Sequence, residues 1–320
     1  MREPIFYMMV GVAGSGKSTC SKELIEDLEN GNIDYVYLSS DKIRGELYGS
    51  EEDQRNPQKV FDLMNRRAND AAFAGKNVIY DATNLSAKRR KHMVAQMKDK
   101  GLKARCIICA ASRDWCVERQ DFRERKVPKE VIDKQIKQFE IPTKMEGWDW
   151  INIYSHIQKD PYKMNSIDYL EQTKIPHDNP HHKLNVFEHS MAVYESVIAA
   201  NEEYYKDNEL GLILRTPVER AALLHDIGKP FTKSFINGKG EKTDIAHYYG
   251  HENAGAWFIL SSNDDLLSPK EKLKCAQLIG LHMKMHNDTW RERLKNYWDK
   301  EDPNFWRDLY ILWEADEEAH

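Results

Sequence analysis

"GVAGSGKS", residues 11–18, decides the fold of the first half of the chain. It lies between the apolar run "IFYMMV" (5–10) and a helical pattern over residues 19–30. The spacing is G-x-x-x-x-G-K-[S/T], in which glycines let backbone N–H groups surround phosphate oxygens and the following helix adds positive potential. We therefore expect a strand, a phosphate-binding loop and a helix, in that order.

The loop also carries the side chains that phosphates and Mg²⁺ require. Lys17 can reach the outer phosphates, and the Ser18 hydroxyl can hold Mg²⁺. Backbone contacts to the phosphates are expected from Gly14, Gly16 and Thr19. These five residues form the candidate nucleotide-binding group.

The segments after the loop alternate between strand and helix patterns. Strands are expected at 33–40, 77–81 and 102–110, and helices at 56–75 and 86–100. Such alternation predicts a parallel sheet covered by helices, with ligands bound at the carboxyl ends of the strands.

Polar residues follow two of the expected strands. Asp41 comes just past the first strand, and Arg44 lies one helical turn further on. Asp41 could accept the proton of an attacking hydroxyl or cap the next helix, and we favour the general base. Asp81 and Asn84 end the next strand, where they could orient an arginine or a metal-bound water, or serve as loop and cap residues.

Arginines dominate the segment "CVERQDFRERKVPKEVI" (116–132). Arg119 and Arg123 are four residues apart and would share one face of a helix, and Arg125 follows them. Arginines that close over a transferred phosphate are expected in phosphoryl transfer. The basic clusters at 88–91 and 119–126 could hold a polyanion, or could be ordinary solvated helix faces.

Charge and composition limit the class of protein. The net charge of −5 argues against a general nucleic-acid binder, but residues 1–150 carry 27 Lys and Arg against 24 Asp and Glu, and the remainder 20 against 28. No apolar run approaches the roughly 18 residues of a membrane span, and no signal peptide is evident. The five cysteines form no disulfide framework, so the cytoplasm is the expected location.

The pattern changes between residues 141 and 180, where prolines and aromatic residues replace regular periodicity. We expect a linker with one or two short elements. Trp148 and Trp150 could stack on a nucleobase, but packing at the seam between domains is the favoured interpretation.

From about residue 183 the chain is expected to be all-helical, and histidines recur on the expected helices. In "AALLHDIGKP" (221–230), His225 and Asp226 fall within a turn that alanines and leucines predict to be buried. A buried carboxylate needs a partner, and a metal ion is the simplest one. The metal candidates are His189, His225, Asp226, His247, His251, His282, His286, Asp316 and His320. Imidazoles with carboxylates suit Mn²⁺, Fe²⁺, Co²⁺, Ni²⁺ or Zn²⁺, with Mg²⁺ also accepted.

The motifs "GVAGSGKS", "SSDKIR", "DATN" and R-x-x-x-R followed by Val-Pro resemble the kinase domain of phage-type polynucleotide 5′-hydroxyl kinases, over roughly residues 5–140. That family has a P-loop fold with an arginine-bearing lid and transfers the γ-phosphate of ATP to a 5′-hydroxyl end. Small-molecule kinases and zeta-toxin-like kinases share much of this arrangement. The resemblance implies ATP and Mg²⁺ binding by Lys17 and Ser18, a general base in Asp41, an acceptor-phosphate contact in Arg44, and ATP-phosphate contacts in Arg119 and Arg123.

The motifs "NVFEHS", "AALLHDIGKP", "HYYGHENAGA", "IGLH" and "EADEEA" resemble the HD phosphohydrolase superfamily, and most closely the HD domains attached to tRNA nucleotidyltransferases. The resemblance covers residues 180–320 and implies metal activation of water, with Lys229 at the scissile phosphate. His247 and His286 lie four residues from two of the implied ligands and remain alternatives to them. The implied ligands are His189, His225, Asp226 and Asp316 for a first metal, and His251 and His282 for a second that Asp226 bridges.

The predicted protein is therefore multidomain. An α/β P-loop parallel sheet is expected at 1–145, a linker at 146–180 and an all-α HD-domain helical bundle at 181–320. Together the resemblances imply a nucleic-acid end-healing enzyme, which phosphorylates 5′-hydroxyl ends and removes a 2′,3′-cyclic, 2′- or 3′-phosphate. RNA or DNA strand ends would be its partners, upstream of an RNA ligase.

Two other functions stay open at this stage. The first is a P-loop kinase for a small molecule or nucleoside, fused to an HD nucleotide phosphohydrolase. The second is a regulatory protein that senses nucleotide and whose HD half is inactive. The sequence keeps every histidine and aspartate of the implied ligand set, in the same order, which argues against an inactive HD half.

Overall fold

The chain forms two compact units. Met1–Gln135 and Pro142–Tyr162 make up the N-terminal unit, and Ile136–Ile141 and Lys163–His320 make up the C-terminal unit. Among the residues described, no helix has both the length and the apolar character needed to cross a membrane. The computed structural model describes residues 3–122, 125–154, 160–179, 183–202, 216–263 and 267–319.

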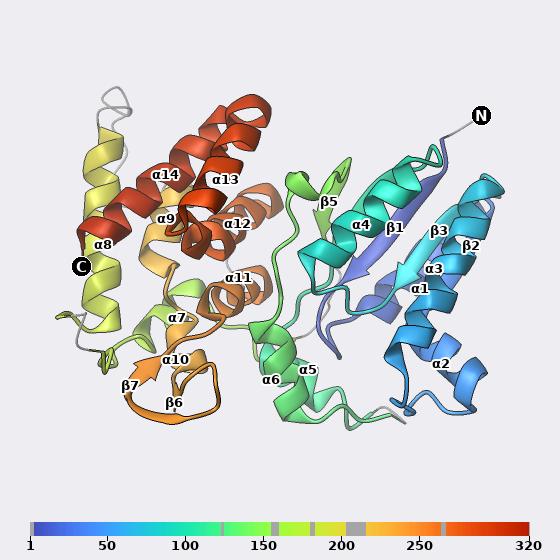
Figure 1. Ribbon diagram of the computed structural model, residues 1–320, viewed down its shortest axis with the longest axis horizontal. Helices are drawn as coiled ribbons and strands as arrows, with labels where there is room; N and C mark the ends of the chain where they lie inside the picture. Colours follow the sequence, from blue (N-terminus) through green and yellow to red (C-terminus); the bar gives the residue numbers. More distant parts are fainter. Residues whose placement is uncertain are drawn as a thin grey trace. The chain divides into compact units, whose positions relative to one another are not determined.

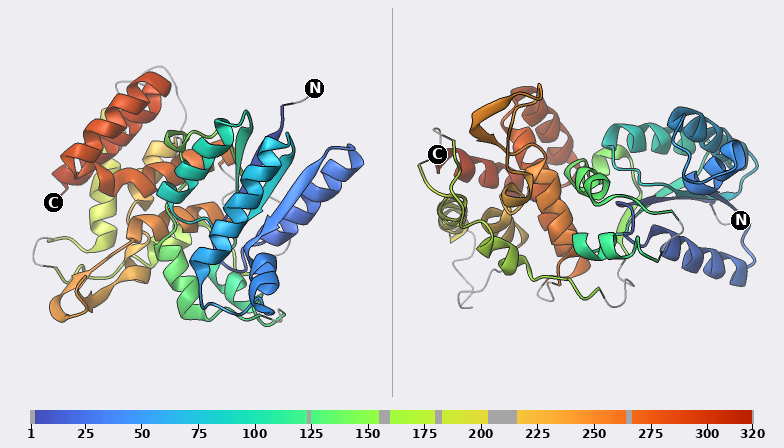
Figure 2. Two further views of the ribbon diagram at one scale, coloured as in Figure 1. Left: turned by 45° about the vertical axis from the view of Figure 1, so that its right-hand side comes forward. Right: turned by 90° about the horizontal axis from the view of Figure 1, so that it is seen from below.

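The N-terminal unit is a five-stranded parallel sheet with strand order β2-β3-β1-β4-β5, covered by helices on both faces (Figures 1 and 2). Seen along the sheet in the right-hand view of Figure 2, α1 lies on one face and α3 and α4 lie on the other. The strands are β1 (Ile5–Val10), β2 (Tyr35–Ser39), β3 (Asn77–Asp81), β4 (Lys103–Ile108) and β5 (Trp150–Ile153). The helices are α1 (Lys17–Asn30), α2 (Ser40–Tyr48), α3 (Pro57–Phe73), α4 (Ala87–Lys98) and α5 (Arg113–Glu118), with a 3₁₀ turn at Lys144–Glu146. Helix α6 (Lys129–Lys137) contains Gln135, the last residue of the first segment of this unit. Its last two residues therefore belong to the C-terminal unit.

The central strand explains why the sequence forms this sheet. All residues of β1 after Ile5 are buried, because β3 and β4 pair with it on both sides and helices cover both faces. Such a strand is a continuous apolar run and not an alternating one. Since parallel strands end at one edge, the loop after β1, the start of α2 and the end of β3 meet at the same edge.

The segment 146–180, predicted to be a linker, contains the fifth strand of the sheet. Strand β5 pairs in parallel with β4, from Arg105 opposite Trp150 to Ile108 opposite Ile153. Its sequence, WINI, is apolar at three of four positions, but the run is short and its residues are only exposed or half-buried. Trp148 is buried in the N-terminal unit, whereas the Trp150 side chain is 41% exposed and lies under the guanidinium of Arg105.

One member of the basic cluster 88–91 is structural. Arg90 is buried and donates to both carboxylate oxygens of Glu146, at 2.7 Å each. A buried charge of this kind needs its partner and is not available to a ligand. Lys88, Arg89 and Lys91 are exposed, so only these three could contact a polyanion.

The described residues of the C-terminal unit are helical apart from a β-hairpin, an element that the expected helical bundle did not include. The hairpin pairs β6 (Ser234–Ile236) with β7 (Lys242–His247) in antiparallel order. Its turn, "NGKG" at 237–240, is typical of a hairpin because Gly240 has a positive φ of 85°. The helices are α7 (Ser166–Glu171), α8 (Val186–Glu202), α9 (Pro217–Leu224), α10 (Lys229–Thr232), α11 (His251–Ser261), α12 (Pro269–Met285), α13 (Asp288–Glu301) and α14 (Pro303–Glu318).

Candidate active sites

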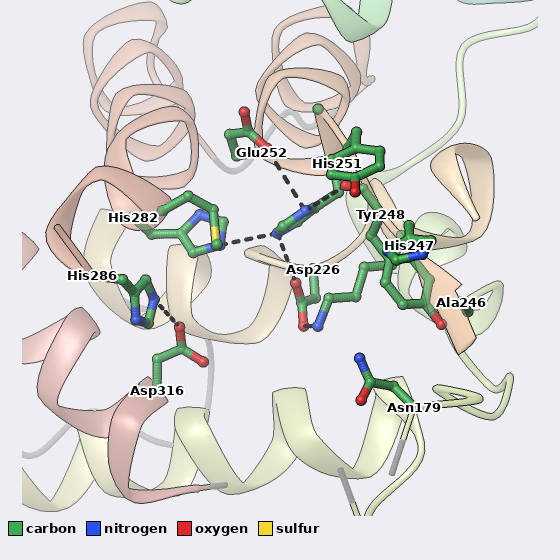
Figure 3. Close-up of a pocket in the computed structure, with 14 residues that line it drawn as sticks. Asn179, Asp226, Ala246, His247, Tyr248, His251, Glu252, His282, His286 and Asp316 are labelled. Carbon is green, nitrogen blue, oxygen red and sulfur yellow. Dashed lines mark hydrogen bonds and ion pairs between the residues drawn. The ribbon is translucent and has the colours of Figure 1, made fainter. Parts of the chain in front are cut away.

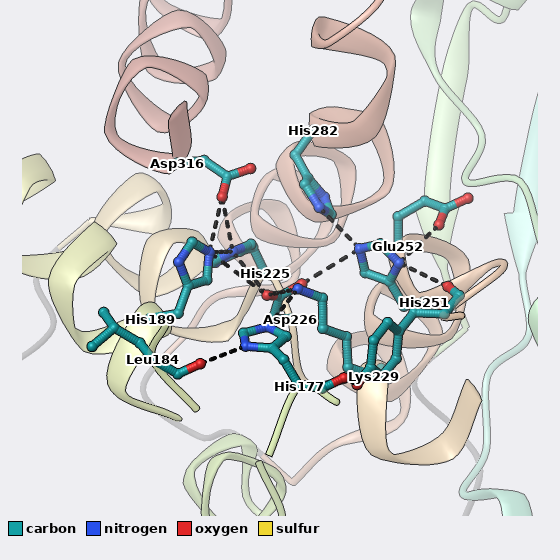
Figure 4. A network of polar contacts seen from close by, with 12 residues as sticks. His177, Leu184, His189, His225, Asp226, Lys229, His251, Glu252, His282 and Asp316 are labelled. Atoms are coloured by element: carbon teal, nitrogen blue, oxygen red, sulfur yellow. Dashed lines mark hydrogen bonds and ion pairs between the residues drawn. The ribbon is translucent and has the colours of Figure 1, made fainter. Parts of the chain in front are cut away.

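Three buried side chains from separate helices form the first cluster in the C-terminal unit. His189 projects from α8, His225 follows the last residue of α9, and Asp316 lies near the end of α14. His189 Nε2 is 3.0 Å from Asp316 Oδ1 and 3.3 Å from His225 Nε2. One ligand atom of each residue lies within 4.8 Å of the others, a spacing that can hold a metal ion (Figure 4).

A second cluster adjoins the first through Asp226. His251 is the first residue of α11, and His282 lies near the end of α12. His251 Nε2 is 3.4 Å from Asp226 Oδ1 and 3.3 Å from His282 Nε2. The other oxygen of Asp226, Oδ2, is 3.4 Å from His225 Nε2. Asp226 therefore faces both clusters, one oxygen toward each.

The backbone sets the orientation of three of the imidazoles. Nδ1 of His225, His251 and His282 donates to the carbonyl three residues earlier, at 2.8, 2.9 and 2.6 Å. Burial lowers the pKa of His282 to about 3, so that ring is neutral. Two Nε2 lone pairs, of His251 and His282, thus face each other at 3.3 Å and would repel unless a cation lay between them. The donor set therefore fits a divalent metal.

The electrostatics of the site also favour a cation. Burial raises the pKa of Asp226, but Lys229 and the neighbouring histidines outweigh it and hold that pKa well below its usual range. Hydrogen bonds from histidines likewise overcome burial and lower the pKa of Asp316. Burial lowers the pKa of His225, yet the two carboxylates raise it to about 10. The ionised carboxylates therefore favour a positive charge beside them. A bound divalent ion could supply that charge.

A glycine allows the two clusters to approach each other. Gly228 begins the turn into α10, and a Cβ atom there would lie 2.0 Å from the backbone oxygen of His251. No side chain fits in that space, so the turn that carries Asp226 packs directly on the start of α11. The Gly in "HDIGK" is thus a packing requirement of the site.

Lys229 and His177 form a pair that extends the site. Lys229 Nζ lies 2.6 Å from Asp226 Oδ2 and 3.1 Å from His177 Nε2. His177 Nδ1 donates to the carbonyl of Leu184 at 2.7 Å, so its Nε2 accepts from the lysine. Burial and the charge of Lys229 lower the pKa of His177 to about 4. His177 was not among the predicted site residues; its only signal is a histidine in the proline-rich "KIPHDNP".

The structure distinguishes between the alternative histidines. His251 and His282 lie in the second cluster, whereas His247 ends β7 and faces Thr243, with Nε2 3.1 Å from the hydroxyl oxygen. His286 Nε2 lies 3.1 Å from Asp316 Oδ2, on the outer side of that carboxylate. His320 lies outside the described residues.

This distinction predicts a difference in metal stoichiometry. His251→Ala should reduce bound Mn²⁺ from about two ions per chain to about one, because it removes a ligand of one cluster only. His247→Ala is the matched control and should bind as much metal as the unmodified protein. Equilibrium dialysis followed by elemental analysis measures both variants, and equal metal content in the two would contradict the ligand set.

A cavity of about 490 Å³ leads to these residues (Figure 3). Asp226 and Lys229 line it together with His282 and Asp316. Its wall also includes Asn179 and the residues 246–252 around the end of β7. A phosphate ester of small size could therefore reach the paired clusters.

The phosphate-binding loop of the N-terminal unit has the backbone that its glycines predict. Gly14 and Gly16 have positive φ angles of 82° and 97°, which side-chain-bearing residues rarely adopt. Lys17 Nζ donates to the carbonyl of Val12 at 2.7 Å, folded over its own loop. Ser18 and Thr19 are exposed in the first turn of α1. The five predicted nucleotide-binding residues therefore lie together.

Asp41 is not the cap of the helix that follows it. Ser39 is the N-cap of α2, and its hydroxyl accepts from the Lys42 amide at 3.4 Å. The Asp41 carboxylate, 34% exposed, instead pairs with Arg44 Nη1 at 2.6 Å and also contacts Arg125. The alternative in which Asp41 serves as the helix cap is therefore excluded, and its carboxylate stays accessible at the strand edge.

The remaining residues at this edge divide into two groups. Arg119 Nη1 donates to the carbonyl of Gly14 at 3.2 Å and so reaches the phosphate-binding loop. Asp81 accepts from the Tyr37 hydroxyl at 2.8 Å, and Asn84 donates to the Met9 carbonyl at 2.7 Å. The first of these contacts joins strands β2 and β3, and the second joins the loop after β3 to β1. Arg123 lies outside the described residues.

Known proteins resemble parts of the chain. A protein from Methanococcus maripaludis, L-seryl-tRNA(Sec) kinase, is 25% identical over 255 residues, which are 75% of this chain and 94% of that protein. Among solved structures, a chain of the Pnkp1/Rnl/Hen1 RNA repair complex is 22% identical with a TM-score of 0.38, over 43% of this chain and 45% of that chain. Kti12 of Chaetomium thermophilum with ADP-AlF3 is 15% identical with a TM-score of 0.37, over 49% of this chain and 92% of that one. This chain thus spans less than half of the RNA repair protein.

Family models match both halves separately. Residues 6–142 match the AAA domain family, and residues 186–307 match the HD domain family. The predicted fold class is confirmed: a parallel α/β domain is followed by a helical domain. A P-loop kinase domain implies ATP with Mg²⁺, and an HD domain implies a divalent metal. The chain therefore joins an N-terminal P-loop kinase domain of the AAA domain family to a C-terminal HD domain.

Proposed function

We propose that the protein heals broken RNA ends with two activities. The N-terminal domain phosphorylates a 5′-hydroxyl end with ATP, and the HD domain removes a 2′,3′-cyclic phosphate or a 2′- or 3′-phosphate. The observation that supports the proposal is that one chain carries both a glycine loop shaped for a phosphate donor and paired clusters of metal-ligand side chains, which suit opposite phosphate chemistries. A cleaved RNA strand needs both changes before its ends can be joined.

In the kinase site, Asp41 is the proposed general base. Its carboxylate accepts the proton of the 5′-hydroxyl, while Arg44 and Arg125 lie beside it to bind the acceptor phosphate. Lys17 and Arg119 bind the donor phosphates from the loop side. Arg123, which lies outside the described residues, is proposed to share this role because of its R-x-x-x-R spacing with Arg119. ATP would supply the transferred phosphate, with Mg²⁺ held at Ser18.

In the HD site, the two clusters are proposed to hold two divalent ions. His189, His225 and Asp316 would hold one ion and His251 and His282 the other, with Asp226 shared between them. Bound ions would polarise the phosphate and lower the pKa of a water molecule. Mn²⁺, Ni²⁺, Co²⁺, Zn²⁺ and Mg²⁺ all accept such ligands.

The lysine and its partner have a separate task in this site. Lys229 lines the cavity beside Asp226, so its ammonium group would neutralise a phosphate oxygen that the ions leave uncovered. His177 accepts from that ammonium group and keeps it directed toward Asp226.

The relative that acts on L-seryl-tRNA supports RNA as the carrier of the accepting hydroxyl. Product ends with a 5′-phosphate and a free 3′-hydroxyl are what an RNA ligase requires, so a ligase is the proposed downstream partner. The alternative, a small-molecule or nucleoside kinase with an HD nucleotide phosphohydrolase, shares both sites and differs only in the size of its substrates.

One substrate tests both activities. An RNA oligonucleotide with a 5′-hydroxyl and a 2′,3′-cyclic phosphate is incubated with ATP, Mg²⁺ and Mn²⁺ or Ni²⁺, and both ends are followed by mass spectrometry. A gain of phosphate at the 5′ end and hydrolysis at the 3′ end are expected. Activity on nucleosides and mononucleotides without any on the RNA would support the alternative, and no change at either end would refute the proposal.

A further inference from the structure

Two aromatic rings stack at the mouth of the HD cavity. The rings of His247 and Tyr249 are nearly parallel, with an interplanar angle of 6° and centroids 5.4 Å apart. Both residues line the cavity that contains Asp226 and Lys229. Figure 3 shows His247 on one side of Asp226, with His286 and Asp316 on the other.

Both rings are held in place, and the Tyr249 ring is still largely open to solvent. The Tyr249 hydroxyl accepts from the Gly238 amide at 3.2 Å, and His247 Nε2 lies 3.1 Å from the Thr243 hydroxyl oxygen. Tyr249 is nevertheless 59% exposed. A rigid, exposed aromatic face at the opening of a polar cavity provides a stacking surface at a low cost in conformational entropy.

Chain geometry ties this surface to the metal-ligand clusters. Tyr249 precedes the ligand residue His251 by two positions, so their Cα atoms can be no more than about 7.6 Å apart. Tyr248, between them, accepts from His251 Nδ1 through its backbone carbonyl. A planar group attached to a phosphate ester could therefore reach the rings while its phosphate lies at Asp226 and Lys229.

We propose that His247 and Tyr249 form a nucleobase-stacking subsite of the HD domain. It takes the base of the nucleotide whose phosphate is hydrolysed, and it accepts any base because every base has a π face. The inference rests on the proposed phosphoesterase function of this domain and adds the part of the substrate that the domain recognises.

The exposed aromatic and aliphatic residues nearby supply a control. Phe235 and Ile236, on β6 of the same hairpin, are 43% and 48% exposed but do not line the cavity. The proposed subsite predicts that replacing Tyr249 weakens binding and replacing Phe235 does not. General hydrophobicity of the hairpin would predict a similar effect for both.

The test compares a substrate with a base and one without. Full-length protein with Mn²⁺ is assayed on adenosine 2′,3′-cyclic monophosphate and on glycerol 1,2-cyclic phosphate. Tyr249→Ala should raise KM for the adenosine substrate by about 5- to 150-fold, the usual worth of one stacked base, with KM for the glycerol substrate unchanged. Tyr249→Phe retains the ring and should recover most of the affinity that Tyr249→Ala loses, although it lacks the hydroxyl that accepts from the Gly238 amide. Phe235→Ala should behave as the unmodified protein.

The possible failures are distinguishable. Equal loss on both substrates, or no loss on either, overturns the subsite while leaving the phosphoesterase function intact. If the unmodified protein hydrolyses neither, adenosine 3′-monophosphate and glycerol 2-phosphate take their place. If it hydrolyses none of the four, the HD activity is judged on the RNA oligonucleotide, and absence of 3′-end hydrolysis there refutes it. Equilibrium binding of adenosine 3′-monophosphate to the unmodified protein and to Tyr249→Ala then decides the subsite, and equal affinity rejects it.

Discussion

Asp226→Ala is expected to reduce 3′-end processing by roughly 10³-fold while 5′ phosphorylation continues at its normal rate. Asp226 is the carboxylate that faces both metal-ligand clusters, one oxygen toward His251 and the other toward His225. Its removal weakens both clusters, and it also leaves Lys229 without its carboxylate partner. The kinase residues lie in the other compact unit and lose nothing.

Both ends of the same RNA should be followed with the variant, and bound metal should be measured in parallel. Asp226→Asn preserves the shape of the side chain and should lose the same activity. This variant distinguishes the effect of the lost negative charge from the effect of lost packing. Asp244→Ala, an exposed carboxylate on β7, is the matched control. Loss of 5′ phosphorylation in a folded Asp226 variant would contradict two independent sites, and full 3′-end processing would contradict the role assigned to Asp226.

Asp41→Ala should produce the opposite pattern, with 5′ phosphorylation reduced by about 10² to 10⁴-fold and 3′-end processing unchanged. The expected loss is that of a general base. Because Ser39 caps α2, the helix keeps its N-terminus when Asp41 is replaced. The main effect should therefore fall on the rate, while the loss of the ion pair with the buried Arg44 lowers the unfolding temperature of the domain only modestly.

The matched control is Asp62→Ala, which removes an exposed carboxylate from α3 in the same unit. Phosphorylation is measured by transfer of labelled phosphate from ATP, and folding by thermal unfolding with and without nucleotide. A fully active, folded Asp41→Ala variant would rule out the proposed base. A variant that also failed to bind nucleotide would assign Asp41 a role in the donor site.

The phosphate-binding loop is the part of the fold that the sequence predicts best, and the reason is steric. Gly14 and Gly16 occupy backbone conformations that other residues rarely adopt, so their spacing records the shape of the loop. The HD turn is similar, since Gly228 is required by the close approach of a backbone carbonyl. Both glycine patterns reflect local backbone geometry, and such geometry can be predicted from a short stretch of sequence.

Features set by tertiary contacts were harder to predict. Strand β5 forms because β4 offers it an edge, and its own four residues make too short an apolar run to predict a strand by themselves. His177 enters the site by its contact with Lys229, from a segment without periodicity. The choice between His247 and His251 could not be made from their spacing. On a continuous helix both would share a face, but here one ends a strand and the other begins a helix.

The division of the chain into segments bears on how the two domains can be studied. The chain leaves the N-terminal unit after Gln135, returns to it at Pro142 and leaves it again after Tyr162. A kinase fragment that ends at residue 145 would lack strand β5, and one that continues through β5 would carry residues 136–141 away from the C-terminal unit. No single cut therefore yields two intact halves. If an expressed half is inactive, the missing segment explains the loss as well as a wrong functional assignment does.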